Sequence, residues 1–360
     1  MFSKPAEVKK EGLFSVGVGL TNACNLACAH CYRDVDRVDY VSLDDIKTLC
    51  ESIPVRAINL GTGENALHPE FKQIIAYLNE RAVKITITSN GYSTSVLSDE
   101  ELCFFHDFEF SLDFPTEQEQ DAFRGEGNWR LIKEQMERCR HLGVSVTVTA
   151  VIMSINYDKM AEIARLVARR GARLRVNAYQ PVKSDAFTLS YDQFWEGYRR
   201  LFAESEIIIC NEPIVRAVLG LRGGRCGCGI ETVRLSPRGE VLPCVYWPGK
   251  RMTLADLKRF GAAIAESEPF TQSQLLPDFC RGCDFVETCA GGCPGRRMLR
   301  GRLDQPDEYC PFTRGDAIRL EYRMAESEDL PKGASACTTI VAGKRSQKRG
   351  PRAFIVPPTS

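Results

Sequence analysis

Three cysteines near the start of the chain, Cys24, Cys28 and Cys31, follow one another in the spacing C-x3-C-x2-C. They come directly after the apolar run 14–20, which predicts a β-strand. Three thiolates on one short loop can hold three irons of a [4Fe–4S] cluster and leave the fourth iron without a protein ligand. An open iron of this kind can bind and reduce a small molecule. The alternatives are three buried thiols or a structural zinc site, for which His30 could supply a fourth ligand.

Up to residue 205, predicted strands and helices alternate. The strands are expected at 14–20, 57–60, 83–88, 108–112, 144–152 and 173–179. The helices are expected at 43–53, 69–81, 99–104, 129–142, 158–170 and 191–203. Such a series of βα units favours parallel strands joined by right-handed crossovers, with the chemistry at the C-terminal ends of the strands. The sequence therefore predicts an α/β fold with its functional site at that end.

Four motifs fall at predicted strand ends, namely the cysteine loop, Gly63-Glu64, the turn 89–91 and the segment 111–113. Together they resemble the radical S-adenosylmethionine (SAM) superfamily over residues 14–205. The resemblance implies a partial (β/α)6 TIM-like barrel. In that superfamily the amino and carboxylate groups of SAM chelate the open iron. One electron then cleaves SAM to a 5′-deoxyadenosyl radical, which abstracts hydrogen from the substrate.

The resemblance also implies cofactor-binding roles for particular residues. The segment 61–64 is similar to the Gly-Gly-Glu motif that binds the methionyl amino group, although Thr62 stands where a second glycine is usual. Asn90 and Ser111 resemble polar groups that contact the methionyl or ribose part of SAM. The implied SAM-binding residues are His30, Gly63, Glu64, Asn90, Ser111 and Asp113, of which His30 is expected near the adenine and Asp113 is expected to face SAM or the substrate.

After residue 221 the composition changes, and cysteines become dense between 226 and 310. Too little apolar sequence lies between them for an ordinary core, so metal coordination could supply the folding energy. The residues around 236–239 predict a β-hairpin. Zinc could divide the cysteines between two tetrahedral sites. The pattern Gly239-x4-Cys244 followed by C-x2-C-x5-C-x3-C, however, resembles the SPASM extension of radical SAM enzymes.

The SPASM resemblance implies two auxiliary [4Fe–4S] clusters, and so three clusters in all. The first is expected on Cys228, Cys244 and Cys293, with Cys226 as fourth ligand and Cys210 as an outside candidate. The second is expected on Cys280, Cys283, Cys289 and Cys310. The five remaining cysteines are expected to be buried free thiols, and they are Cys50, Cys103, Cys139, Cys210 and Cys337.

These patterns divide the chain into segments. We expect an N-terminal lead-in at 1–13, the barrel at 14–205, a linker at 206–225, the small cysteine-rich SPASM domain with its β-hairpin at 226–312, a closing helix at 313–330 and a disordered basic tail at 331–360. Because only about thirteen residues precede the first expected strand, we expect no peptide-recognition domain fused at the N-terminus.

The overall charge points to neither a nucleic-acid nor a membrane partner, because Lys+Arg and Asp+Glu number 47 each. The N-terminus lacks the apolar core of a signal peptide, and no run approaches the ~18 apolar residues of a membrane span, so a cytoplasmic location is expected.

Many SPASM enzymes modify ribosomally made peptides. The resemblance therefore implies oxidative peptide modification in natural-product or cofactor biosynthesis, with flavodoxin or ferredoxin as reductant and a separate protein that presents the peptide. The first alternative is a SPASM-type enzyme that acts on a sugar, a nucleoside or a tetrapyrrole precursor. The second is an iron–sulfur carrier or scaffold without chemistry of its own. Substrate contacts cannot be assigned, although Arg124, Tyr179, Gln180 and Tyr246 lie near predicted strand ends or the hairpin.

Overall fold

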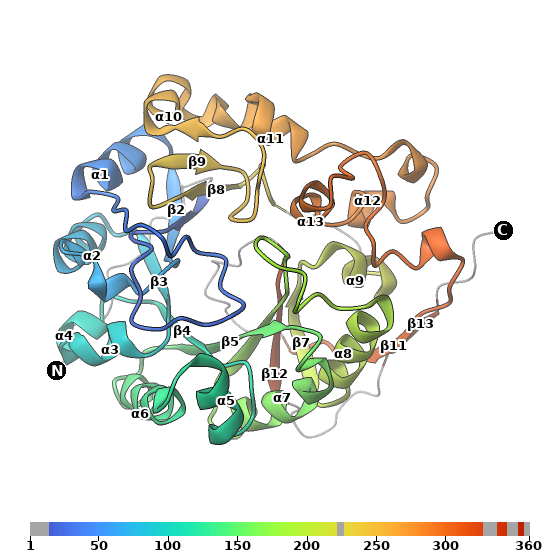
Figure 1. The fold of residues 1–360 in the computed structure, drawn as a ribbon, viewed down its shortest axis with the longest axis horizontal. Helices are drawn as coiled ribbons and strands as arrows, with labels where there is room; N and C mark the ends of the chain where they lie inside the picture. The colour runs from blue at the N-terminus through green and yellow to red at the C-terminus, as the bar shows by residue number, and fades with distance from the viewer. Residues whose placement is uncertain (1–13, 222–226, 327–336, 344–351, 356–360) are drawn as a thin grey trace.

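The computed structural model of the protein describes residues 14–221, 227–326, 337–343 and 352–355. Six parallel strands form the centre of the fold, in the order in which they occur in the chain (Figure 1). They are β1 (Phe14–Val18), β2 (Val55–Leu60), β3 (Lys84–Ser89), β4 (Asp107–Ser111), β5 (Val146–Ile152) and β6 (Arg173–Ala178). This arrangement confirms the predicted series of βα units and the α/β class of the fold.

Helices cover the outside of these strands (Figure 1). They are α1 (Leu43–Ser52), α2 (Phe71–Glu80), α3 (Tyr92–Val96), α4 (Asp99–Leu102), α5 (Glu117–Arg124), α6 (Asn128–His141), α7 (Met160–Ala168) and α8 (Tyr191–Ala203). Helix α1 begins where a capping box forms, because Ser42 and Asp45 satisfy each other's backbone N–H groups. Helix α5 was not predicted from the sequence; its polar composition, with a single buried residue, gives little helical periodicity.

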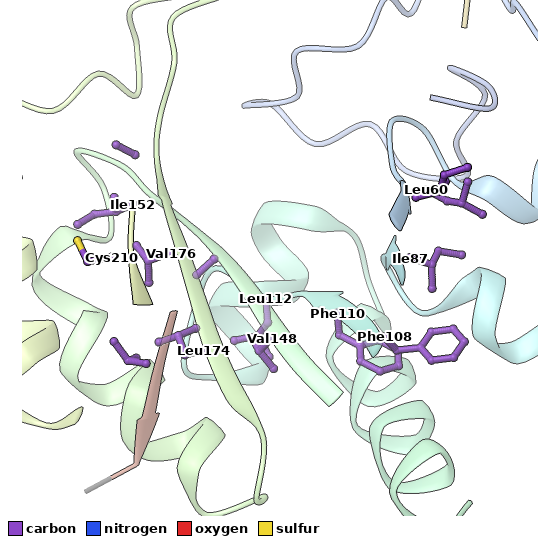
Figure 2. Packing of buried hydrophobic residues seen from close by; sticks show 14 of the residues in the cluster. Leu60, Ile87, Phe108, Phe110, Leu112, Val148, Ile152, Leu174, Val176 and Cys210 are labelled. Atoms are coloured by element: carbon purple, nitrogen blue, oxygen red, sulfur yellow. The ribbon is translucent and has the colours of Figure 1, made fainter. Parts of the chain in front are cut away.

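Apolar side chains on the outer face of the strands form the core between the sheet and the surrounding helices. Leu60 and Ile87 point into the same cluster as Phe108, and Val148 and Leu174 continue it toward β6 (Figure 2). All of these side chains are buried, so the strands present a continuous apolar layer to the helices that surround them.

The predicted β-hairpin extends the barrel sheet at one edge. Strands β8 (Thr232–Leu235) and β9 (Glu240–Leu242) are antiparallel, and β8 pairs in parallel with β1. Strand β10 (Met252–Thr253) completes this edge. The hairpin therefore places the cysteine-rich region directly beside the first strand of the barrel.

The other edge of the sheet corrects two predictions. The expected linker 206–225 contains β7 (Ser205–Cys210) and α9 (Pro213–Val218). The expected disordered tail contains β12 (Thr339–Gly343), which inserts antiparallel between β6 and β7, and β13 (Arg352–Ile355). The middle of β7 and the middle of β12 are β-branched, but the charged and small residues on either side of them concealed the strand pattern in the sequence.

The predicted closing helix at 313–330 is wrong for its described part. A single 3-10 turn at Phe312–Arg314 ends at Gly315, which has a φ of 67°. Strand β11 (Arg319–Tyr322) follows and pairs with β13. In β11, exposed and buried residues alternate with the period of two that is typical of a strand. Residues 327–330 lie outside the described residues.

The cysteine-rich region joins the two sides of the barrel (Figure 1). Its helices are α10 (Leu254–Phe260), α11 (Glu268–Gln272), α12 (Val286–Cys289) and α13 (Pro294–Leu299). Helix α10 packs against α1, and α12 packs against α9. None of the helices in the described ranges has the length and apolar character that a bilayer span requires.

Candidate active site and cysteine clusters

A cavity of about 600 Å³ lies at the C-terminal ends of the barrel strands. Residues from β1, β2, β3, β4, β5 and β6 line it, as the barrel prediction requires. The same cavity is lined by cysteines of both predicted systems, which are Cys24, Cys28, Cys31, Cys228, Cys244 and Cys293, and also by Cys337, which was expected to be a free thiol. The fold therefore brings the cysteine loop and part of the C-terminal cysteine region to one space.

The cysteine loop is held by hydrogen bonds at its sulfurs. Cys24 Sγ accepts from the Leu26 N–H at 3.5 Å, and Asn90 Nδ2 lies 3.7 Å from the same sulfur. Nη1 of Arg124 lies 3.9 Å from Cys28 Sγ. Burial raises the pKa of the Cys24 and Cys28 thiols, whereas the Arg124 guanidinium lowers that of Cys28. Hydrogen-bond donors and a guanidinium beside the sulfurs stabilise thiolates, which are the form of cysteine that binds iron.

Gly63 packs the turn after β2 against the cysteine loop. Its φ is 66°, and a Cβ at this position would overlap the carbonyl oxygens of Thr21 and Ala23. The next residue, Glu64, donates its backbone N–H to Ala23 O at 2.7 Å. Only a residue without a Cβ fits this close approach, so the glycine of the predicted SAM motif is explained by its contact with the cysteine loop.

The Glu64 carboxylate is fully occupied by the turn after β3. It is 1% exposed and accepts from Ser89 Oγ at 2.6 Å, from the Asn90 N–H at 2.9 Å and from the Ser93 N–H at 2.8 Å. Asn90 in turn donates to Asn25 Oδ1 at 2.9 Å. Glu64 therefore positions Asn90 beside the cysteine loop, and the backbone of the turn, more than the carboxylate, is available to a ligand.

His30 and Ser111 both line the cavity, as predicted. The His30 ring stacks on Phe123 with 4.9 Å between ring centroids. Burial lowers the pKa of His30 to about 4, so the ring is neutral at physiological pH. Its Nδ1 is buried and has no hydrogen-bond partner among the described residues. His30 therefore presents a neutral aromatic ring at the cavity wall.

Asp113 does not line the cavity and has a different place from the one predicted. It is completely buried and forms an ion pair with Arg124, with 2.7 Å between Nη2 and Oδ2. Arg124, which α5 carries, is the member of this pair that reaches the cavity. Asp113, which follows β4, thus holds the Arg124 guanidinium in place beside the cysteine loop.

The residues predicted for the first auxiliary cluster lie together where they are described. A Cβ on Gly295 would meet Cys244 Sγ at 3.4 Å and Cys293 Sγ at 3.9 Å, so the missing side chain leaves space between two thiols. Cys228 and Cys244 form a small buried cluster with Trp247 that is separate from the main core. Cys226 lies outside the described residues.

Cys210, the outside candidate, belongs to the apolar core instead (Figure 2). Its sulfur lies 3.3 Å from Thr339 Oγ1 between β7 and β12, and burial raises its pKa to about 12. It does not line the cavity. Cys50, Cys103 and Cys139 are buried as well, as expected for structural thiols.

The residues predicted for the second auxiliary cluster influence one another electrostatically. The pKa of Cys289 is raised to about 12 by burial and by the neighbouring thiols Cys310, Cys283 and Cys280. In the described part of the chain, no three His, Cys, Asp or Glu side chains converge on one point as the ligands of a single metal ion do. The thiolates of a [4Fe–4S] cluster each bind a different iron.

Three residues of the cavity were missed or left unassigned by the sequence analysis. Tyr32 donates or accepts a 2.8 Å hydrogen bond with Thr62 and makes an edge contact with Tyr246 at 5.3 Å between ring centroids. Arg234 lies on β8, and Cys337 precedes β12. A charged residue inside the apolar alternation of the hairpin was the available signal for Arg234, whereas nothing in the sequence relates Cys337 to the other cysteines.

Comparison with known proteins agrees with this geometry. Residues 18–167 match the model of the radical SAM superfamily. The mycofactocin maturase MftC of Mycobacterium tuberculosis is 26% identical over 323 residues, with 81% of each chain covered. The antilisterial bacteriocin subtilosin biosynthesis protein AlbA of Bacillus subtilis is 25% identical over 311 residues, which cover 76% of this chain and 65% of AlbA.

Two solved structures share the fold. Streptococcus suis SuiB bound to S-adenosylmethionine has a TM-score of 0.64 at 15% identity, over 82% of this chain and 76% of SuiB. Native anSMEcpe with bound AdoMet has a TM-score of 0.64 at 16% identity, over 82% of this chain and 94% of its own. The chain therefore carries a radical SAM domain over residues 18–167, and this match supports SAM and a [4Fe–4S] cluster as cofactors.

Proposed function

We propose that this enzyme oxidatively modifies a ribosomally made peptide, and that a side chain of the peptide enters the cavity between the cysteine loop and Cys244. The observation that carries the proposal is the single cavity lined by both cysteine systems. Relatives named as a mycofactocin maturase and a subtilosin biosynthesis protein support a peptide substrate, and SuiB has been solved with its precursor peptide SuiA.

Cys24, Cys28 and Cys31 would hold the SAM-binding cluster. When bound there, SAM supplies a radical that removes a hydrogen atom from the substrate. Glu64 holds the turn that carries Asn90 against the cysteine loop, and His30 offers its ring to the adenine. Arg124 offsets the negative charge of the thiolates.

The C-terminal cysteines would give the reaction its oxidative direction. A substrate that loses a hydrogen atom keeps an unpaired electron, and an oxidised product requires that this electron leave. A cluster on Cys228, Cys244 and Cys293, with Cys226 as its fourth ligand, would be fully ligated and could accept it across the shared cavity. A second cluster on Cys280, Cys283, Cys289 and Cys310 could pass it on. A flavodoxin or ferredoxin would reduce the SAM-binding cluster, and a separate protein would present the peptide.

A small-molecule substrate is the second candidate, because the cavity volume of about 600 Å³ lies within the usual range for small-molecule sites. A sugar, a nucleoside or a tetrapyrrole precursor could occupy it without a peptide chain outside. A pure electron carrier is not compatible with the classification as a radical SAM enzyme.

The test is formation of 5′-deoxyadenosine by anaerobically reconstituted enzyme with SAM and dithionite. Lysate of the host is divided by size into a peptide fraction and a small-molecule fraction. Stimulation by the peptide fraction that disappears after prior proteolysis supports peptide modification. Stimulation by the small-molecule fraction alone contradicts it and supports the second candidate. A Cys28→Ser variant, which lacks one ligand of the SAM-binding cluster, controls for background cleavage.

A further inference from the structure

We propose that Cys337 is a protein ligand of the first auxiliary cluster, beside Cys244 and Cys293. The inference rests on the proposal that this region holds auxiliary clusters, and it adds a ligand from a segment beyond the cysteine pattern that suggested them. The sequence analysis placed Cys337 among the free thiols. The structure places it at the cavity that the other cysteines line.

The position of the sulfur is the first argument. Cys337 Sγ lies 3.7 Å from Cys293 Sγ. A disulfide requires about 2.05 Å, so the two thiols are in hydrogen-bonding contact and are not joined by a disulfide. Cys337 also packs against the small buried cluster of Cys228, Cys244 and Trp247. Cysteines from separate parts of the chain therefore converge on one place, beside the space that Gly295 leaves open.

The backbone around Cys337 is the second argument, because it fixes where the sulfur can be. Thr338 and Thr339 are completely buried, and β12 is paired on both sides. Thr338 Oγ1 accepts from Arg175 Nε at 3.1 Å. Cys337 itself has a φ of 58°, which is uncommon for a residue with a Cβ. The central sheet thus holds Cys337 in an unfavourable conformation that turns its side chain toward Cys293.

The alternatives for this ligand differ in what the structure says of them. Cys210 is enclosed in the core beside Thr339 and does not reach the cavity. Cys226 lies outside the described residues, so it enters the test as a rival. If Cys337 binds iron, cluster assembly at this site and insertion of β12 between β6 and β7 stabilise each other, because each requires the other to be in place.

The test counts and characterises auxiliary clusters without any substrate. The parent is the full-length chain with Cys24→Ser, Cys28→Ser and Cys31→Ser, so that its iron belongs to the auxiliary sites alone. Cys337→Ser, Cys337→Ala, Cys226→Ser and Cys226→Ala are added to it one at a time. Cys139→Ser, at a completely buried thiol of α6, is the matched control. Each protein is reconstituted anaerobically and studied by iron analysis, Mössbauer spectroscopy and electron paramagnetic resonance (EPR).

For Cys337→Ser we expect altered g values of one reduced cluster, because an oxygen replaces a sulfur ligand. For Cys337→Ala we expect an open iron, seen as a hyperfine coupling when ¹³C-cyanide is added. Cys139→Ser should match the parent. Spectra unchanged in both Cys337 variants would overturn the proposal, and so would an altered signal without cyanide binding, since that describes a neighbour and not a ligand.

The Cys226 variants complete the ligand set. Cyanide binding to a Cys226→Ala variant, by the same criterion as for Cys337→Ala, would make Cys226 a ligand as well, whereas an altered spectrum without it would make Cys226 a neighbour. A parent protein that binds no iron would contradict the auxiliary clusters themselves, which is a different failure from a loaded parent whose Cys337 variants look normal.

Discussion

Asp113 and Arg124 form a buried ion pair beside the cysteine loop, with 2.7 Å between Oδ2 and Nη2. The carboxylate also accepts from Arg124 Nε at 2.8 Å and from the Val151 N–H at 2.8 Å. Because Val151 belongs to β5, the sheet fixes the carboxylate and the carboxylate fixes the guanidinium. One cation is thereby held within 3.9 Å of a thiol that must become a thiolate to bind iron.

The first prediction is that Asp113→Asn lowers the free energy of unfolding by about 3–5 kcal/mol, because a buried arginine then lacks its carboxylate. Anaerobic urea unfolding measures this. Arg130→Gln is the control, since Arg130 and Glu117 form an exposed pair 3.8 Å apart. That variant should change stability by less than about 1 kcal/mol. Equal losses in the two variants would contradict the importance of the buried pair.

A second prediction concerns Arg234, which lies opposite Gly17 in the pairing of β8 with β1. A Cβ on Gly17 would overlap the Arg234 guanidinium, so the glycine gives the arginine its room. Arg234 forms no hydrogen bond or ion pair with the described residues, whereas Arg124, Arg175, Arg238 and Arg251 at the cavity are each paired with a carboxylate. We expect Arg234 to bind an acidic group of the substrate.

Arg234→Gln should therefore raise the KM for the stimulating peptide by roughly 10- to 100-fold, the equivalent of a hydrogen bond to a charged group. Gly17→Ala should act in the same direction because it displaces the guanidinium, and Arg234→Lys should restore part of the affinity. Binding of SAM, measured separately, should stay the same. A weakened SAM complex with an unchanged peptide KM would show that Arg234 serves the cofactor instead.

The barrel was predictable because its strands have apolar runs long enough to show a period, and because most of the helices between them, though not α5, have an apolar stripe. Strand β12 was not, because Thr339 and its neighbours are surrounded by residues typical of a disordered tail. Its place between β6 and β7 depends on pairing with β7, which is distant in the chain. Local composition carries no information about such a partner.

The candidate site was predictable to the extent that its chemistry is local. The spacing of Cys24, Cys28 and Cys31 lies within one loop, and Glu64 follows directly from a strand end. The role of Glu64 as an anchor for Ser89 and Asn90 was not predictable, because it depends on how two adjacent strands end side by side. The approach of Cys337 to Cys293 depends on the entire order of the sheet.

A third prediction concerns the link between the cysteine region and the barrel. Arg296 of α13 is 1% exposed and lies 2.6 Å from Asp307 and 2.8 Å from Glu212, the residue that precedes α9. Arg296→Met should lower the free energy of unfolding by about 3–5 kcal/mol, because two buried carboxylates lose their cation. Anaerobic urea unfolding again measures this.

Arg300→Met is the control for that change. Arg300 follows Arg296 by one helical turn and pairs with Glu308 at 3.3 Å. Its side chain is 25% exposed, however, and the Glu308 carboxylate remains hydrated. We expect a loss below about 1 kcal/mol for it. If the Arg296 variant were as stable as the Arg300 variant, the buried triad would not be what joins α13 to α9.

The last prediction is a dependence of stability on pH that arises at His68. The ring is 3% exposed, its Nε2 lies 2.9 Å from Val41 O, and its Nδ1 accepts the Glu70 N–H at 3.0 Å. One nitrogen donates and the other accepts, so the folded protein holds the neutral ring, and burial lowers the pKa of His68. In the unfolded chain the pKa is about 6.5, and the unfolded state therefore takes up a proton first as the pH falls. His68 consequently contributes its full stability above pH ~6.5 and loses it below, at up to about 1.4 kcal/mol per pH unit.

Urea unfolding between pH 7.5 and 5.5 should show a shallower slope for His68→Gln than for the parent, while His141→Gln, at an exposed histidine, should keep the parent slope. The slope should not vanish in the His68 variant, because burial also lowers the pKa of His30 and His106. Parallel slopes for the parent and His68→Gln would mean that His68 is protonated equally in the folded and unfolded states.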